Sequence, residues 1–201
     1  MRKRQTDSSG VQPEADGDCR SVSPNKLAVE PNTPFPFGTI HAEIPESSPA
    51  ASALASVREE IAEEDLAGRG LDVGSTHITL RYGVQGEDIS AVEALLKTQG
   101  PITATLGPTS YFPPSGSNGV AVIIATIECP ELHVLHERLG KVVDFIEPAF
   151  GYQPHVTVAY VRPEVAEKYV GNPITAGHTF VISEVVIRTR SKDEIIVTLN
   201  G

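Results

Sequence analysis

The 201-residue chain has no tryptophan, only two cysteines and no long apolar run. Cys19 lies in a polar stretch that we expect to be unfolded, so no structural disulfide with Cys129 is expected, and two cysteines are too few for a cysteine-based metal site. The apolar runs, such as residues 120–127, are far too short to cross a bilayer. Residues 1–4 are basic, but no apolar segment follows them, which argues against a secretory signal. We therefore expect a cytoplasmic protein with no membrane partner.

Positive charge is also scarce, and the formal net charge is −10. Residues 1–33 carry five basic and five acidic side chains, which leaves 11 basic against 21 acidic for the rest of the chain. Binding to long nucleic acid depends on Lys and Arg side chains that neutralise phosphates, so we do not expect a long nucleic acid as partner. A small anionic ligand held by a few local groups remains compatible with this charge.

Large apolar residues are nearly missing from residues 1–33, which are rich in Ser, Pro, Asp, Gly and Asn. Such a segment cannot bury enough apolar surface to offset the entropy lost on ordering. We predict a disordered polar tail at 1–33, whose partner, if it has one, is unknown. Residues 34–201 form the folded domain.

Strand and helix patterns alternate along residues 34–201, and we predict them from apolar spacing, caps and breakers. The predicted strands are 37–44, 75–84, 102–112, 119–129, 155–161, 179–190 and 194–199, and the predicted helices are 49–66, 90–99, 130–146 and a short one at 163–170. Gly68 and Gly70 are expected to end the first helix. Because a helix leads into a similar strand in each half, the order suggests an internal duplication. We predict an α+β fold of two pseudo-symmetric lobes around a central cleft.

One short pattern occurs twice, at residues 77–82 (HITLRY) and 155–160 (HVTVAY). Both copies read histidine, aliphatic, threonine, aliphatic, variable, tyrosine. Side chains alternate between the two faces of a strand. We therefore expect the His, the Thr and, in the first copy, Arg81 on one face, with the aliphatic residues and both tyrosines on the core side. Such a strand would present an imidazole and a hydroxyl from a rigid, buried backbone.

This pairing suits chemistry on a phosphate. Histidine titrates near neutral pH, so His77 and His155 on opposite walls of a cleft could divide the base and acid roles of one in-line displacement at phosphorus. The hydroxyls of Thr79 and Thr157 would donate hydrogen bonds to the non-bridging oxygens, where charge develops. Arg81 would add a charge-assisted contact, and the second copy has alanine at that position, so the site would be asymmetric. For one copy alone, a simple half-exposed strand is the better interpretation, but two matching copies make coincidence a poor explanation.

The two His-x-Thr copies resemble the signature of the two-histidine (2H) phosphoesterase superfamily, which includes RNA 2′,3′-cyclic phosphodiesterases, also called 2′-5′ RNA ligases. The likeness covers about residues 35–200. It implies two lobes, each a mainly antiparallel sheet with helices on its outer face, and a reaction without metal or cofactor. It also implies that His77 and His155 are the acid-base pair and that Thr79 and Thr157 bind the phosphate. The implied substrates are cyclic or 2′-linked phosphodiesters in small nucleotides, cyclic oligonucleotides or RNA ends.

Several other side chains could have either a functional or a purely structural role. His133 and His136 have helical spacing and could hold a metal, but without an evident third ligand a solvated helix face is favoured. His41 either points into the cleft or is an exposed structural histidine. Tyr111 and Phe112 could stack a base, although core packing is favoured.

Arg188 and Arg190 share a strand face, and a solvent-facing pair is a simpler interpretation than contact with a ligand phosphate. The function that we predict is a metal-independent phosphodiesterase. The alternative is a protein that binds a nucleotide in the same cleft without turning it over.

Overall fold

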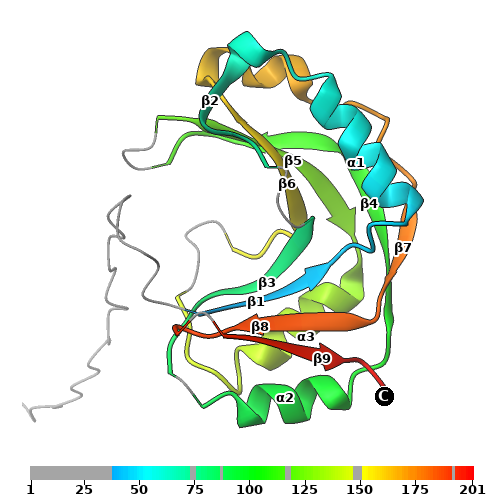
Figure 1. The fold of residues 1–201 in the computed structure, drawn as a ribbon, viewed down its shortest axis with the longest axis vertical. Helices are drawn as coiled ribbons and strands as arrows, with labels where there is room; N and C mark the ends of the chain where they lie inside the picture. The colour runs from blue at the N-terminus through cyan, green and yellow to red at the C-terminus, as the bar shows by residue number, and fades with distance from the viewer. Residues whose placement is uncertain (1–37, 73–75, 87, 116–118, 147–150, 192) are drawn as a thin grey trace, which may run out of the picture. The chain divides into compact units, whose positions relative to one another are not determined.

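The computed structural model describes residues 38–72, 76–86, 88–115, 119–146, 151–191 and 193–201, which belong to one compact unit. The tail predicted at 1–33 lies outside these residues. The described residues form two antiparallel sheets with few helices, which confirms the predicted α+β class (Figure 1). Sheet A has the strand order β3-β1-β8-β9 and sheet B the order β2-β6-β5-β4-β7. The strands of sheet A are β1 (Gly38–Glu43), β3 (His77–Val84), β8 (Glu184–Arg188) and β9 (Glu194–Thr198), and those of sheet B are β2 (Leu66–Leu71), β4 (Ile102–Phe112), β5 (Ala121–Glu128), β6 (His155–Val161) and β7 (Thr179–Ile182).

Each sheet has helices on one face. The helices α2 (Ser90–Lys97) and α3 (Pro130–Leu139) pack on sheet A, whereas α1 (Pro49–Glu59) and the 3₁₀ segment η2 (Pro163–Tyr169) pack on sheet B. α1 begins where the hydroxyl of Ser48 accepts a hydrogen bond from the Ala51 amide, with proline at the first helical position. None of the helices in the described ranges is long and apolar enough to cross a membrane.

The core lies between each sheet and its helices. On β3, the side chains of Ile78 and Leu80 are buried, and on β6 those of Val156 and Val158 are buried in the same way. The apolar stripes of α2 and α3 cover sheet A with buried leucines and a valine: Val92, Leu96, Leu132, Leu135 and Leu139. Burying these side chains supplies much of the driving force for folding and anchors both repeated strands from behind.

Two predicted elements have different bounds in the structure. The helix predicted at 49–66 ends at Glu59, and the 3₁₀ segment η1 (Glu63–Asp65) then leads into β2, which pairs with β6. Gly68 and Gly70 lie inside this strand, with φ values of 58° and 70°. They permit the irregular backbone of an edge strand and do not end a helix. The helix predicted at 130–146 ends at Leu139.

The long strand predicted at 179–190 is two strands that belong to different sheets. β7 pairs with β4 in sheet B, and β8 pairs with β1 in sheet A. The chain passes from one sheet to the other at Ser183. The alternation of buried and exposed residues in β7 breaks at Ser183 and Glu184, which are both exposed, before buried residues resume in β8. The single strand that we predicted overlooks this break.

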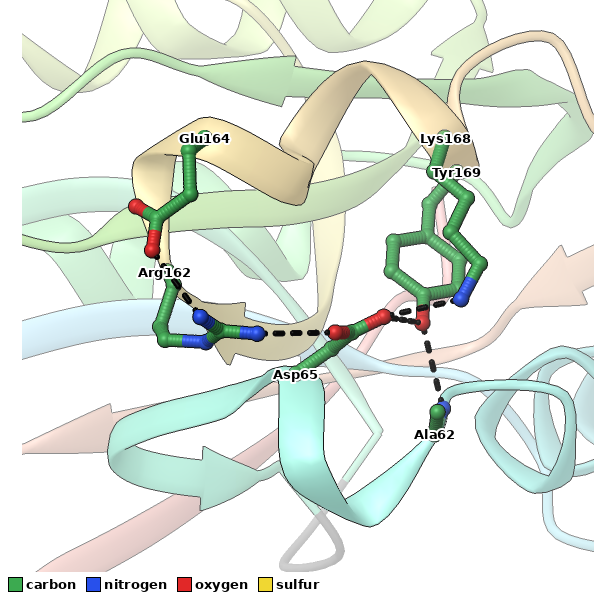
Figure 2. A network of polar contacts seen from close by, with 6 residues as sticks. All are labelled: Ala62, Asp65, Arg162, Glu164, Lys168 and Tyr169. Atoms are coloured by element: carbon green, nitrogen blue, oxygen red, sulfur yellow. Dashed lines mark hydrogen bonds and ion pairs between the residues drawn. The ribbon is translucent and has the colours of Figure 1, made fainter.

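A buried carboxylate ties η1 to η2 (Figure 2). Asp65 is 5% exposed and accepts hydrogen bonds from Arg162 Nη2 at 3.1 Å, from Lys168 Nζ at 2.9 Å and from the Tyr169 hydroxyl at 2.6 Å. The hydroxyl of Tyr169 in turn accepts a bond from the Ala62 amide. The Tyr169 hydroxyl, followed by the Lys168 ammonium, lowers the pKa of Asp65 to about 2. The carboxylate is therefore charged at neutral pH, and both of its oxygens accept hydrogen bonds.

Candidate active site

The two repeated strands lie in different sheets and next to each other. β3 is an edge strand of sheet A, β6 belongs to sheet B, and the two strands are in contact (Figure 1). A cavity of about 370 Å³ lies between the sheets and is lined by Thr79 of β3 and His155 of β6, among others. Each copy thus places one predicted site residue on the wall of this cavity, whereas His77 and Thr157 are not among the residues that line it.

His155 has its own hydrogen bond and a defined tautomer. Its Nδ1 lies 2.6 Å from the carbonyl oxygen of Gln153. Because a carbonyl can only accept, Nδ1 carries the proton and Nε2 is the ring atom that can exchange a proton with a ligand. Burial is the main cause that lowers the pKa of His155. The Gln153 contact opposes this effect, and the nearby charge of His77 adds to it. His77 is thus close enough for its charge to disfavour the charged form of His155.

Each of the two imidazoles also contacts a second ring. The ring centroids of His77 and His41 are 5.1 Å apart in an edge-to-face arrangement, and those of His155 and Phe112 are 4.9 Å apart in the same manner. His41 is 4% exposed and lies opposite Thr79 on the neighbouring strand β1. Burial, followed by the charges of His77 and Arg188, lowers the pKa of His41 to about 4, so this ring is neutral at physiological pH. The structure matches neither reading of His41, because the ring is buried beside His77 and is not among the residues that line the cavity.

Both repeated strands contain a β-bulge directly after the threonine. On β1 the pairing partner changes from Arg81 to Thr79 between adjacent residues, which skips Leu80. On β5 it changes from Ala159 to Thr157, which skips Val158 in the second copy. A bulge adds one residue to one strand, and every later side chain then points to the other face. The strict alternation that we expected therefore ends at the same position in both copies.

The bulges correct two of our predictions. Tyr82 and Tyr160 were expected on the core side, but both are partly exposed and line the cavity. Arg81 was expected beside His77 and Thr79, but its side chain is 5% exposed. Its guanidinium stacks on the ring of Phe145, with Cζ 3.6 Å from the ring centroid, and Nε donates to the His136 carbonyl at 2.9 Å. The structure therefore buries the Arg81 side chain against α3 and the segment after it, although Arg81 is still one of the residues that line the cavity.

The cavity wall is mostly apolar and rich in rings. Core packing was the favoured prediction for both Tyr111 and Phe112, and it holds for Tyr111. Phe112 instead lines the cavity, which is the position that base stacking would need. The aromatic residues of the wall are Tyr82, Phe112, Phe145, Tyr152 and Tyr160. A planar group fits such a wall better than a row of phosphates does. The tyrosines were visible in the repeated pattern, but only the bulges give them this position.

Of the remaining predicted candidates, His136 lines the same cavity and Arg188 does not. His136 is buried on α3 and stacks on Tyr152 with ring centroids 3.8 Å apart, so the solvated helix face predicted for it is wrong. Arg188 is exposed and its Nε donates to Glu194 at 3.0 Å, which agrees with the solvent-facing interpretation. Within the described ranges, no group of three or more His, Cys, Asp or Glu side chains is arranged to hold a metal ion.

A family model and several solved structures are similar to this chain. The model described as the 2′-5′ RNA ligase superfamily matches residues 45–194. TT0787 of Thermus thermophilus is 16% identical, with a TM-score of 0.51 over 82% of this chain and 98% of that one. Usb1 of Kluyveromyces marxianus is 12% identical, with a TM-score of 0.56 over 83% and 100%. The same yeast protein with uridine monophosphate is 13% identical, with a TM-score of 0.54 over 81% and 98%. The amino-acid sequence matches no curated protein. At these identities, the structural similarity concerns the fold.

Proposed function

The chain belongs to the 2′-5′ RNA ligase superfamily, also called the 2H phosphoesterases, and on this basis we propose that it is a phosphodiesterase that uses His77 and His155 as an acid-base pair. Family membership supports phosphodiesterase activity in general. The finer proposal is hydrolysis of a cyclic or 2′-linked phosphodiester in a small nucleotide, a cyclic oligonucleotide or an RNA end, without a metal ion.

One observation carries the proposal: the two repeated strands belong to different sheets and are in contact, and one cavity is lined by Thr79 of the first copy and His155 of the second. The charge of His77 is one of the causes that lower the pKa of His155, so the two rings are near each other. An acid-base pair needs one ring ready to accept a proton and the other ready to donate one.

We assign the base role to His155 and the acid role to His77. Burial keeps His155 neutral at pH 7, and its Nδ1 proton is engaged with Gln153, so Nε2 is the acceptor. For a 2′,3′-cyclic phosphate, Nε2 would take a proton from the attacking water, and His77 would donate a proton to the departing ribose oxygen as its bond to phosphorus breaks. Thr79 and Thr157 would donate hydrogen bonds to the non-bridging oxygens.

The cavity supports a small substrate with at least one ring. Its volume of about 370 Å³ lies near the lower end of the range for small-molecule sites, and its wall carries Tyr82, Phe112 and Tyr160. Stacking on aromatic side chains is how proteins commonly hold an unpaired base. A phosphodiester that carries a nucleobase fits this wall.

A mixed substrate panel tests the proposal. We would incubate the protein with 2′,3′-cyclic mononucleotides, 2′-5′ and 3′-5′ dinucleotides and cyclic oligonucleotides, with and without EDTA, and identify the products by mass. We expect turnover of at least one class, unchanged by EDTA. Activity that EDTA removes and a divalent ion restores would replace the two-histidine mechanism with a metal mechanism.

Binding without turnover is measured separately. Because the chain lacks tryptophan, Tyr160→Trp introduces a single tryptophan at the cavity wall, and its fluorescence should be quenched by a nucleotide that stacks on it. Tyr111→Trp places the same reporter outside the cavity and should not respond. Quenching of the first variant, without any product from the unmodified protein over the whole panel, would favour a nucleotide-binding protein over an enzyme.

A further inference from the structure

The bulges of β3 and β6 occupy equivalent places in the two copies but are held by different groups. In the second copy, the carbonyl oxygen of the skipped residue Val158 accepts a hydrogen bond of 3.0 Å from the backbone amide of Asp72, beside the edge strand β2. Almost any residue at position 72 could supply this amide. The bulge of β6 is therefore secured by backbone alone at this point.

In the first copy, a side chain and not a backbone amide makes the equivalent hydrogen bond. The carbonyl oxygen of the skipped residue Leu80 lies 2.7 Å from Nδ1 of His136 on α3. Nδ1 must be the donor, since a carbonyl can only accept, and both the neutral Nδ1–H tautomer and the imidazolium can make this bond. His136 is separated from Leu80 by 56 positions in the sequence. The contact is thus a tertiary one that joins α3 to the repeated strand.

The same residue also holds the next position of the bulge. The backbone carbonyl of His136 accepts the bond from Arg81 Nε at 2.9 Å, and Arg81 Nη2 approaches the same oxygen. One helical residue therefore contacts both members of the bulge, through its ring at Leu80 and through its carbonyl at Arg81. His136 is 7% exposed, and its ring is stacked against the cavity-lining Tyr152, so the ring has little room to turn.

We propose that His136 is a positioning residue that sets the bulge of β3 through its Nδ1–H bond to Leu80, and so fixes how Thr79 faces the cavity. The proposal rests on the proposed function for its catalytic consequence only. Thr79 directly precedes the bulged residue, and a donor that must reach a phosphate oxygen is sensitive to small displacements of its strand. His136 lines the cavity, but its Nδ1 is engaged with the Leu80 carbonyl, so the role that we assign to it is to position β3 and not to exchange a proton with the substrate.

Three substitutions separate the hydrogen-bond donor of the His136 ring from its stacking on Tyr152. His136→Phe keeps a ring against Tyr152 but removes the donor. His136→Asn removes the ring but keeps a donor, because the side-chain amide nitrogen is the same number of bonds from the backbone as Nδ1. His136→Leu removes both. We expect kcat to fall between about tenfold and a hundredfold in the Phe and Leu variants, with little change in KM, and to stay within about threefold of the unmodified protein in the Asn variant.

The matched control is His133→Phe on the same helix. His133 is exposed and its ring also contacts Tyr152, with centroids 5.3 Å apart, but it makes no bond to the described residues of β3. This variant should retain kcat. If His136→Asn loses as much kcat as His136→Phe, the ring and not the donor matters, and the proposal is wrong.

Nuclear magnetic resonance provides a readout that needs no turnover. Amide signals of His77 and Thr79 should shift in His136→Phe and remain in place in His136→Asn. In the unmodified protein, nitrogen shifts of the His136 ring should identify a protonated Nδ1. A ring protonated at Nε2 alone would overturn the proposal without any variant having to fold. A chain that turns over no substrate but shows these signals would contradict the proposed function and leave the positioning role standing.

Discussion

At the scale of single residues, the account depends on how His155 is kept neutral. Its pKa is lowered mainly because the ring is buried, and Phe112 is one of the groups that cover it. A lower pKa means that the base form persists as the pH falls below the ordinary value of 6.5. The acidic limb of the rate profile should therefore lie below pH 6.5.

Removing the Phe112 ring that covers His155 should shift the acidic limb of the rate profile. In Phe112→Ala, water reaches the ring, the pKa of His155 rises toward its ordinary value, and the acidic limb of kcat/KM shifts to higher pH. The measurement is kcat/KM against pH for this variant and for Tyr111→Ala, its sequence neighbour, which faces the core. A profile that does not move in Phe112→Ala, or that moves equally in both variants, would contradict the assignment of His155 as the buried base.

At this scale the sequence pattern predicted the candidate site residues but not all of their geometry. The pairs His77 with Thr79 and His155 with Thr157 followed from strand alternation, and alternation is a local property that a pattern reports well. Arg81 and the two tyrosines were assigned to the wrong faces because each lies beyond a bulge. Neither copy has a glycine or proline at the skipped position, so nothing in the local residues marks the bulge.

At the scale of secondary-structure elements, α3 and β3 depend on the absence of a side chain at Gly140. This glycine ends α3 with ordinary helical angles, so alanine is compatible with its backbone. A Cβ atom there would overlap Arg81 Nη2 and would lie 3.0 Å from a ring carbon of Phe145. The guanidinium is held by the His136 carbonyl and cannot withdraw without losing that bond.

Gly140→Ala should therefore destabilise the fold by about 1–3 kcal/mol, a typical cost of overpacking. The measurement is the free energy of unfolding in urea. The control is the same substitution in an Arg81→Ala background, where the obstructing group is gone and the two effects should not add. Equal costs in both backgrounds would show that Arg81 is not the residue that Gly140 accommodates.

The contacts of Asp65 between η1 and η2 lead to a prediction about the stability of the fold at acidic pH. The pKa of Asp65 is about 2 in the folded protein and 3.8 for an ordinary aspartate, so the unfolded chain binds the proton first as the pH falls. The stability that Asp65 contributes is complete above about pH 4 and disappears as the pH approaches 2. Asp65→Asn removes both the contribution and its pH dependence.

The measurement is the free energy of unfolding from about pH 7 to about pH 2. The unmodified protein should lose stability more steeply between about pH 4 and pH 2 than Asp65→Asn does. Glu164→Gln is the matched control, because Glu164 binds the same Arg162 at the exposed end of the network. Parallel curves for the unmodified protein and Asp65→Asn would mean that the carboxylate is not held as Figure 2 shows.

At the scale of the whole molecule, the sequence indicated two similar halves but not how the chain passes between the two sheets. Two copies of one pattern, each preceded by a helix, indicated two lobes, and the structure has one copy in each sheet. The sheets themselves exchange chain segments. β1 of sheet A precedes α1 and β2 of sheet B, and the C-terminal part of the chain crosses back at Ser183. Such crossings depend on which edges are open in three dimensions, and no local pattern records that.

The central claim is that His77 and His155 act together on one phosphorus atom, and the kcat of three variants tests it most directly. On whichever substrate the panel identifies, His77→Ala and His155→Ala should each lower kcat by about 10²–10⁴-fold while leaving nucleotide quenching of Tyr160→Trp largely intact. The double variant should lose little more than either single variant, because groups that act as a unit are not additive. Near-normal kcat in either single variant, or a loss in the double variant equal to the product of the two, would contradict the claim.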